Sequence, residues 1–218
     1  MRAAVIPAYN EEKTIREIAE RTKKFVDHVV VVDDGSTDGT FDEAKRAGVE
    51  VIRHEKNMGK AVALKTGFAR LGDYDIVITM DGDLQHLPEE IPVLLSGIED
   101  GCDLCIGSRF LSNSNRMPIL NKISNRITSI LLSVLTRQKI TDPQCGFRAI
   151  RREALEKLEL AADRYAVEHI MTLEAARKGF KIREMAISCV YGGETSHISP
   201  IKDTVNVIYN VLRFILSK

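Results

Sequence analysis

Two carboxylates with a glycine between them are the residues of this sequence best suited to chemistry. Asp81, Gly82 and Asp83 follow the apolar run DIVITM, and Gln85 adds a neutral oxygen two residues later. Oxygen ligands of this kind suit Mg²⁺ or Mn²⁺, which one or two carboxylates can hold together with the phosphates of a substrate. Because Gly82 has no side chain, the backbone can approach a ligand closely there. The sequence therefore predicts a divalent cation at Asp81, Asp83 and Gln85.

A second acidic turn follows another apolar run. Asp33 and Asp34 end the stretch HVVVVDD and precede Gly35 and Ser36. Their carboxylates could accept hydrogen bonds from a nucleotide base or from ribose hydroxyls. The competing interpretation is a glycine turn followed by a helix cap. The two are compatible, with the aspartates on the ligand and the later residues capping the helix.

The stretch Asn57-Met58-Gly59-Lys60 opens a predicted helix. The N-terminal amides of that helix and the Lys60 ammonium could face phosphates. The P-loop pattern GxxxxGK[ST] is absent, as is GxGxxG after the first apolar run. A nucleotide site built from acids and a metal, without either glycine loop, points away from kinases and dehydrogenases.

These residues need elements that bring them together, and the first 110 residues alternate regularly. Runs rich in Val and Ile predict strands at 3–9, 28–34, 49–54, 75–81 and 103–108. Amphipathic stretches predict helices at 11–25, 40–47, 59–71 and 88–99. This alternation indicates an α/β fold with a doubly wound, mainly parallel sheet. Ligands bind at the carboxyl ends of such strands, and polar clusters follow four of the five, which predicts one shared cleft.

The second half carries longer amphipathic stretches. The hydrophobic period predicts helices over 116–136 and 201–216, and a third helix over 168–178. A turn and a short strand are expected around 142–148, and a further strand over 181–190. No linker or internal repeat divides the chain. One domain, residues 1–218, is the simplest organisation.

Composition limits the class of function. Lys+Arg and Asp+Glu are both 31, so the net charge is zero and no basic excess drives nucleic-acid binding. Cys102 and Cys105 have CxxC spacing, but on a strand they are expected to point to opposite faces. We therefore expect free thiols in place of a zinc site or a disulfide.

The combined motifs resemble the inverting glycosyltransferases of family 2. The matching stretches are IPAYNEE, VVDDGSTDGT, NMGKAVALKTGF, MDGDLQH, GSRF and DPQCGFRAIRRE, in family order over about two-thirds of the chain. DLQH and DPQCGFR look most like the dolichol-phosphate and polyprenyl-phosphate mannosyl- and glucosyltransferases. The resemblance implies a glycosyltransferase-A fold, with a nucleotide-sugar half (1–110) and an acceptor half (111–218). The Q-x-x-R-W motif of processive polysaccharide synthases is absent, and the chain has no Trp.

The resemblance also implies roles for single residues on the donor side. Asp81 and Asp83 would hold the metal and the diphosphate, with Gln85 assisting. Lys202 matches a position that meets the donor diphosphate in similar enzymes. The residues that would line the pocket for the base and the ribose are Pro7, Tyr9, Glu11, Val32, Asp33 and Asp34.

On the acceptor side, the resemblance implies that Arg109 meets a phosphate. An anionic phosphate needs no strong general base, but cations must bring two anions together. Arg148 is a further candidate cation. Asp142 would be the catalytic base if the acceptor were a hydroxyl group, and a turn or cap residue otherwise. Asn121 stands where some close relatives have an acceptor-binding Arg, and Lys122 or Arg126 would substitute.

Two predicted helices, 118–135 and 201–216, combine a wide apolar face with basic residues. A basic amphipathic helix can lie in the bilayer interface, whereas packing on the core or on a second subunit is the ordinary alternative. Together with the resemblance, this pattern implies a peripheral protein on the cytoplasmic face of a membrane. A homodimer and a separate membrane-anchor protein are alternative partners.

The reaction expected from these features is inverting, metal-dependent transfer of a hexose from a nucleotide diphosphate sugar to a polyprenyl or dolichyl phosphate. GDP-mannose is the first expected donor and UDP-glucose the second. The alternatives are the same donor chemistry with a soluble or glycan hydroxyl acceptor, an inactive sugar-nucleotide-binding module, and a nucleotidyltransferase. The acidic stretch PAYNEE argues against the last, which usually carries a glycine- and base-rich phosphate loop there.

Overall fold

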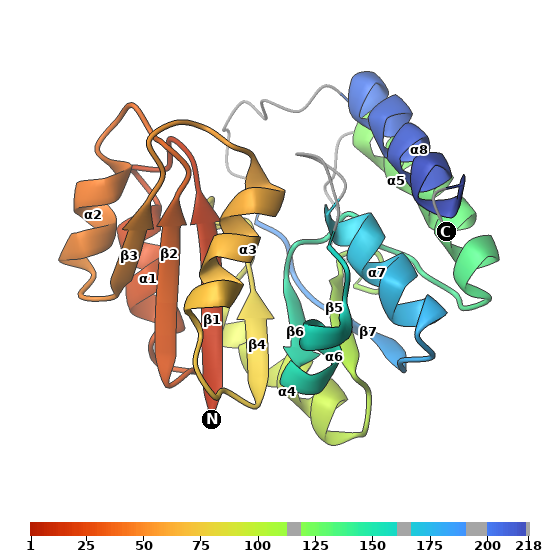
Figure 1. The fold of residues 1–218 in the computed structure, drawn as a ribbon, viewed down its shortest axis with the longest axis horizontal. Coiled ribbons are helices and arrows are strands. Elements are labelled where there is room, and N and C mark those ends of the chain that lie inside the picture. Colours follow the sequence, from red (N-terminus) through yellow and green to blue (C-terminus); the bar gives the residue numbers. More distant parts are fainter. Residues whose placement is uncertain (113–118, 161–166, 191–199, 217–218) are drawn as a thin grey trace.

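A seven-stranded β-sheet forms the centre of the protein (Figure 1). The computed structural model describes residues 1–112, 119–160, 167–190 and 200–216. The strands are β1 (Arg2–Ala8), β2 (His28–Asp33), β3 (Glu50–Arg53), β4 (Ile76–Thr79), β5 (Leu104–Ser108), β6 (Arg148–Arg151) and β7 (Ile182–Ala186). The helices are α1 (Ile15–Thr22), α2 (Thr40–Arg46), α3 (Lys60–Arg70), a 3₁₀ turn η1 (Pro88–Glu90), α4 (Ile91–Glu99), α5 (Ile119–Thr136), α6 (Arg152–Lys157), α7 (Val167–Arg177) and α8 (Pro200–Leu216).

The strand order is β3-β2-β1-β4-β6-β5-β7. All neighbouring pairs are parallel except β4–β6 and β5–β6, which are antiparallel. This confirms the expected doubly wound, mainly parallel sheet. The central strands are buried on both faces, as the unbroken apolar runs predicted, and Ala3, Val5 and Val31 have no exposed surface.

The reversed strand β6 brings a distant loop to the functional edge of the sheet. Arg148, its first residue, pairs with Thr79 of β4 and with Ile106 of β5. Because β6 runs in the opposite direction, its amino end lies at the edge where β4 and β5 end. The chain that enters β6, residues 140–147, therefore reaches the same edge as the polar clusters.

Helices cover both faces of the sheet. α3 and α6 lie in front of it in Figure 1, and α1 and α4 lie behind. On the rear face, Arg21 of α1 pairs with Glu89 of η1 at 2.7 Å, an exposed contact that links α1 to the start of α4. The main core fills both spaces between helices and sheet.

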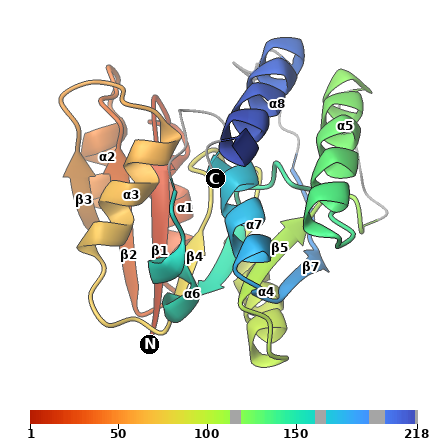
Figure 2. The ribbon, with the colours of Figure 1, turned by 45° about the vertical axis from the view of Figure 1, so that its right-hand side comes forward.

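A second small core joins α5, α7 and α8 at one end of the sheet (Figure 2). Its buried members are Leu132, Ile170, Leu173, Val207 and Val211. The predicted helices 118–135 and 201–216 are thus present as α5 and α8. Within the described ranges, no helix is long and apolar enough to cross a membrane.

The expectation for Cys102 and Cys105 is only partly right. Both are free thiols, as predicted. However, β5 begins at Leu104, so Cys102 precedes the strand. The rule that side chains alternate between the two faces of a strand therefore does not apply to it. The two thiols hydrogen-bond to each other, and this bond lowers the pKa of Cys102. The argument that they must point to opposite faces is therefore wrong.

Gly67 offers a test of how closely α3 packs on the sheet. A Cβ at this position would lie 2.3 Å from Cγ1 of Val5, which is fully buried in β1. We expect Gly67→Ala to lower the free energy of unfolding by about 1–3 kcal/mol, although alanine is the better helix former.

Urea unfolding measures the effect. Gly72→Ala is the matched control, because a Cβ there would meet no atom within 4 Å. Its expected change is within about 0.5 kcal/mol. Equal stability of the Gly67 variant and the parent would show that α3 sits further from β1.

Candidate active site

A lysine and two carboxylates from three different elements meet at the carboxyl end of β4. Lys60, the first residue of α3, forms ion pairs with Asp81 and with Glu168 of α7, the latter at 2.6 Å. Burial alone would lower the pKa of Lys60, but the charges of Asp81 and Glu168 outweigh it, and the pKa is raised. Burial would likewise raise the pKa of Asp81, yet the Lys60 charge holds it below its ordinary value. Lys60 and Asp81 are therefore charged together.

Gly146 makes room for this cluster. A Cβ on Gly146 would lie 2.6 Å from Oδ2 of Asp81 and 2.7 Å from Nζ of Lys60. The Gly146 carbonyl accepts a hydrogen bond of 2.7 Å from the hydroxyl of Thr79, the last residue of β4. The loop before β6 thus closes one side of the cluster, and only glycine leaves the space for the carboxylate.

Asp83 follows Asp81 by two residues, and both are partly exposed. Burial, and after it the negative charge of Asp81, raises the pKa of Asp83 to about 6. The Asp83 carboxylate accepts a hydrogen bond of 3.0 Å from the backbone N–H of Gln85. A Cβ on Gly82 would lie 3.5 Å from its nearest neighbours, which is an ordinary contact distance. The protein atoms around this turn therefore do not by themselves require a glycine.

The donor set fits Mg²⁺ or Mn²⁺ completed by substrate phosphates. Burial and the charge of neighbouring Asp81 both raise the pKa of Asp83, and a divalent cation would relieve the repulsion between the two carboxylates. Within the described residues no group of three or more His, Cys, Asp or Glu side chains forms a complete metal cage. Mg²⁺ commonly takes one or two carboxylates and the substrate's phosphates, which is what Asp81 and Asp83 offer.

The second acidic turn makes mainly protein contacts. Asp34 accepts hydrogen bonds from the N–H groups of Met58 (2.9 Å) and Gly59 (2.7 Å) and contacts Nδ1 of His54 at 2.7 Å. Asp33 is fully buried and accepts a hydrogen bond from the Ser36 N–H at 2.9 Å. Asp34 therefore fixes the start of α3, and with it Lys60.

The other predicted donor residues lie at the same edge. Pro7 and Val32 are paired in register on β1 and β2, and both are buried. Tyr9 follows β1 and is 44% exposed. The Glu11 carboxylate accepts a hydrogen bond of 3.0 Å from the Thr14 hydroxyl. Tyr9 is thus the exposed member of this set, Glu11 is partly exposed, and Pro7 and Val32 are buried.

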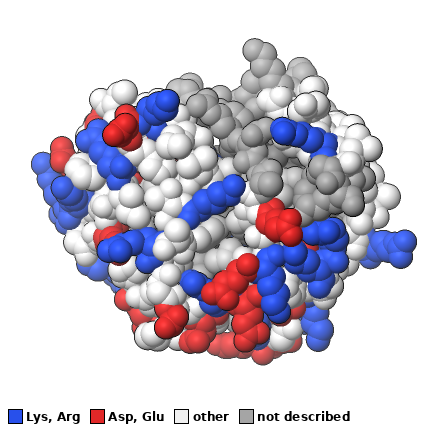
Figure 3. Space-filling model, viewed as in Figure 1, with Lys and Arg blue, Asp and Glu red and all other residues white. Residues whose placement is uncertain are grey.

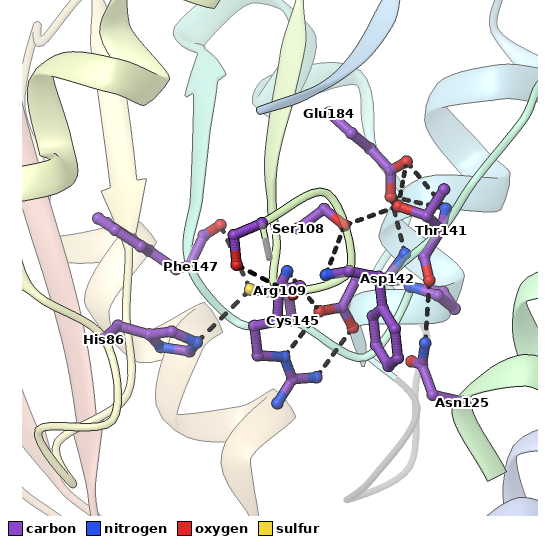
Figure 4. A network of polar contacts seen from close by, with 12 residues as sticks. His86, Ser108, Arg109, Asn125, Thr141, Asp142, Cys145, Phe147 and Glu184 are labelled. Carbon is purple, nitrogen blue, oxygen red and sulfur yellow. Dashed lines mark hydrogen bonds and ion pairs between the residues drawn. The ribbon is translucent and has the colours of Figure 1, made fainter. Parts of the chain in front are cut away.

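Arg109, which directly follows β5, forms a second buried ion pair with Asp142 (Figure 4). Nε and Nη2 of Arg109 donate to the two carboxylate oxygens of Asp142 at 2.7 and 2.8 Å, and the Arg109 backbone N–H donates to Oδ2 at 3.1 Å. The Asp142 side chain is 0% exposed. A two-point contact of this kind fixes the plane of the guanidinium as well as its position.

Residues 3–159 of the chain match the sequence profile of Glycosyl transferase family 2. The chain belongs to glycosyl transferase family 2. Polyprenol monophosphomannose synthase of Mycolicibacterium smegmatis is 35% identical over 84% of this chain and 75% of that protein. UDP-N-acetylglucosamine--dolichyl-phosphate N-acetylglucosaminyltransferase of Methanococcus voltae is 31% identical over 86% of this chain and 84% of that protein.

A solved structure confirms the fold of this family 2 chain. Glucosyl-3-phosphoglycerate synthase from Mycobacterium tuberculosis, in complex with Mn²⁺, uridine diphosphate and phosphoglyceric acid, superposes with a TM-score of 0.80. The two are 24% identical, over 98% of this chain and 78% of the other. The expected glycosyltransferase-A fold is therefore confirmed.

Arg148 is buried in the fold, which contradicts the role predicted for it from the sequence. The sequence suggested an acceptor-binding cation, but Arg148 is 1% exposed. Its guanidinium donates to the carbonyl oxygens of Pro143, Cys145 and Glu168 and to the Thr172 hydroxyl, at 2.8 to 3.0 Å. Arg148 therefore ties the loop before β6 to α7 in this family 2 chain and is not available to an acceptor phosphate.

The remaining predicted cations lie on the two outer helices. Lys122 is partly exposed and Arg126 is exposed, both on α5. Lys202 lies on α8, but its side chain is outside the described part of the structure. In Figure 3, acidic side chains gather along the lower border of the molecule, away from the end that carries α5 and α8.

The sequence did not single out Glu168, Glu184 or Thr141, although all three contact the residues of the site. Glu168 lies on a helix whose residues 167–175 are all buried, and an acid in such a helix is a signal that could have been used. His86 follows the acidic turn at Asp81 and Asp83. It is buried, burial lowers its pKa to about 4, and its ring stacks on Phe147.

Replacing Arg148 tests its structural role. In Arg148→Met, four buried acceptors lose their donor, so we expect the free energy of unfolding to fall by at least about 3 kcal/mol. Urea unfolding checks this. Arg126→Met, on the exposed face of α5, is the control and should change stability by less than about 0.5 kcal/mol. Similar values for both variants would contradict the role given to Arg148.

Proposed function

We propose that this protein transfers a hexose, with inversion, from a nucleotide diphosphate sugar to a polyprenyl or dolichyl phosphate at a membrane surface. The observation that carries the proposal is the pairing of two charged clusters at one sheet edge. Asp81, Asp83 and Lys60 form the donor cluster, and the Arg109–Asp142 pair forms the acceptor cluster. Family membership supports sugar transfer, and the names of two relatives support a lipid-phosphate acceptor.

The state of Asp142 favours a phosphate acceptor over a hydroxyl acceptor. A hydroxyl group needs a base within hydrogen-bond reach. Asp142 was the predicted base, but it is fully buried, and both of its oxygens accept hydrogen bonds from Arg109. A phosphate is already anionic near neutral pH and needs only a cation to place it. Arg109 serves that need, with Asp142 as the residue that orients it.

On the donor side, Asp81 and Asp83, with Gln85, would hold Mg²⁺ or Mn²⁺. When bound, the cation neutralises the negative charge that develops on the departing diphosphate. Lys60 adds a fixed positive charge at the same place. Its ammonium now contacts Asp81, so a bound diphosphate would compete with this carboxylate for Lys60. We therefore expect the metal and the nucleotide to bind better together than either does alone.

GDP-mannose is the first donor to test and UDP-glucose the second. The mycobacterial relative is named for mannose transfer and the archaeal relative for N-acetylglucosamine transfer, so the base and the sugar must be found by experiment. Tyr9, exposed at the end of β1, and the turn at Asp33 and Asp34 are the residues nearest to a bound base in this proposal.

The polarity of α5 supports a membrane-facing role. The face turned to the protein is mostly polar, with Ser124, Asn125, Thr128 and Ser129 buried. The exposed face carries large apolar side chains: Ile119, Leu120, Ile123, Ile127, Ile130 and Val134. On α8, the exposed apolar side chains are Val205, Tyr209, Leu212 and Leu216. A helix that faces outward with its apolar side needs an apolar environment to cover it.

Charge favours a lipid surface as that environment. Between residues 104 and 141 the sequence contains no Asp or Glu but six Lys and Arg residues. Anionic lipid head groups attract such a basic surface, while acyl chains accept the isoleucines. This arrangement would also bring a lipid-linked phosphate to Arg109. We therefore propose peripheral binding to the cytoplasmic leaflet, with a homodimer or an anchor protein as the alternatives to test.

Calorimetry with GDP, UDP and their sugars, with and without Mn²⁺, tests the donor site. We expect one base to bind, and Mn²⁺ to strengthen that binding. Asp83→Asn should lose most of the Mn²⁺-dependent gain, because the cation loses a charged ligand. Asp73→Asn, an exposed acid before β4, is the control and should bind as the parent does. Failure of the folded parent to bind any of these nucleotides would overturn the donor site.

Sedimentation with vesicles tests the apolar face. The double variant Ile123→Gln, Ile127→Gln should bind vesicles of phosphatidylcholine and phosphatidylserine at least about tenfold more weakly, because two exposed isoleucines that would enter the lipid are lost. Lys24→Gln, exposed beyond α1, is the control. Unchanged vesicle binding by the double variant would contradict the proposed contact between α5 and the membrane. A concentration-dependent dimer of the parent would identify a second copy of the chain as the partner of this face.

A further inference from the structure

The short segment that carries Asp142 is held by a carboxylate from a distant strand (Figure 4). Glu184 of β7 accepts hydrogen bonds from the backbone N–H of Thr141, at 2.8 Å to each oxygen, and from the N–H of Asp142 at 2.8 Å. The Thr141 hydroxyl lies 2.8 Å from Oε2 of the same side chain. One carboxylate therefore binds two consecutive backbone amides and the hydroxyl between them.

The strand pair that carries Glu184 also carries Arg109. Glu184 is in register with Ile106 of β5, and Arg109 follows β5 directly. The Ser108 hydroxyl, at the end of β5, lies 2.6 Å from the Thr141 hydroxyl. Glu184, Ser108 and Arg109 thus share one rigid frame, and Thr141 is bound to it at two points.

Helix α5 holds the segment from the other side. Nδ2 of Asn125 donates to the Thr141 carbonyl at 2.9 Å, and the Ser133 hydroxyl donates to the Ile140 carbonyl at 3.1 Å. Residues 140–142 therefore have backbone partners on both sides, so the Asp142 side chain has little freedom to move. Burial raises the pKa of Glu184, while its hydrogen bonds favour the charged form.

We propose that Glu184 is a positioning residue for the acceptor site: it fixes Thr141 and Asp142, and through Asp142 it sets the direction of the Arg109 guanidinium. This inference rests on the proposed function, in which Arg109 binds the acceptor phosphate. Glu184 itself touches neither substrate, since its oxygens are occupied by the segment. Its charge strengthens bonds to the two amides, and small misplacements of a phosphate-binding group reduce turnover strongly.

The test compares Glu184→Ala and Glu184→Gln in the full chain. Undecaprenyl phosphate is the acceptor probe, and the nucleotide sugar that binds in calorimetry is the donor. We expect Glu184→Ala to raise the KM for undecaprenyl phosphate by about ten- to hundredfold while leaving nucleotide affinity within twofold of the parent. Glu184→Gln keeps one carbonyl oxygen for the two amides and should recover part of the loss.

Asp103→Asn is the matched control. Asp103 also accepts a backbone hydrogen bond across the β5–β7 pair, from the Lys181 N–H at 2.8 Å, but at the opposite end of the strands. In this variant we expect no difference between the effect on nucleotide affinity and the effect on the KM for undecaprenyl phosphate. Equal losses of donor and acceptor affinity in Glu184→Gln, or a fall in stability alone, would overturn the proposal and leave Glu184 a purely structural residue.

Two further measurements separate this inference from the proposed function. In an Arg109→Lys background, Glu184→Gln should have no additional effect on the acceptor KM, because its action passes through the guanidinium. The Nε–H signal of Arg109 in ¹⁵N NMR should shift in Glu184→Gln and not in Asp103→Asn, whatever the acceptor is. An unchanged signal would overturn the positioning role. A shifted signal without transfer to undecaprenyl phosphate would instead overturn the acceptor assignment.

Discussion

The direction of β6 is the constraint on which the site depends. Among the strands that the structure describes, six point in one direction, and the residues predicted to bind the donor gather at the carboxyl ends of β1, β2 and β4. β6 runs in reverse between β4 and β5. Its amino end therefore meets their carboxyl ends, and the loop before it delivers Gly146 to Asp81 and Asp142 to Arg109. Were β6 parallel, that loop would lie at the opposite edge of the sheet, away from Asp81 and Arg109.

Opposite charges hold the two clusters in place. Lys60 is paired with Asp81 and Glu168, and Arg109 with Asp142, in surroundings where an unpaired charge would be costly. Breaking either pair without replacing it is therefore unfavourable. In the proposed function, a diphosphate with its cation would replace the partners of Lys60 and Asp81, because it brings charges of both signs. The Arg109–Asp142 pair would stay intact, with Asp142 orienting the guanidinium toward a second anion.

Helix α5 links the outer surface to this acceptor cluster. Its buried polar side chains Asn125 and Ser129 donate to the carbonyl groups of residues 141 and 140, while its isoleucines face outward. This polarity is the reverse of an ordinary surface helix, in which apolar residues face the core. The same helix therefore presents the apolar surface and supports the backbone next to Asp142. Recognition of a lipid chain and placement of its phosphate would then share one element.

The sequence by itself determined the five strands of the first half, their parallel arrangement, the acidic pair at Asp81 and Asp83, and membership in the family. These follow from local patterns, because strand periodicity and the residues after each strand are properties of short stretches. Tertiary structure alone decided that Arg148 is buried in the fold, that Asp142 is bound to Arg109, and that Glu184 supports them both. Each of these depends on which distant segments lie side by side, and local periodicity carries no information about the partner that a charged side chain finds across the sheet.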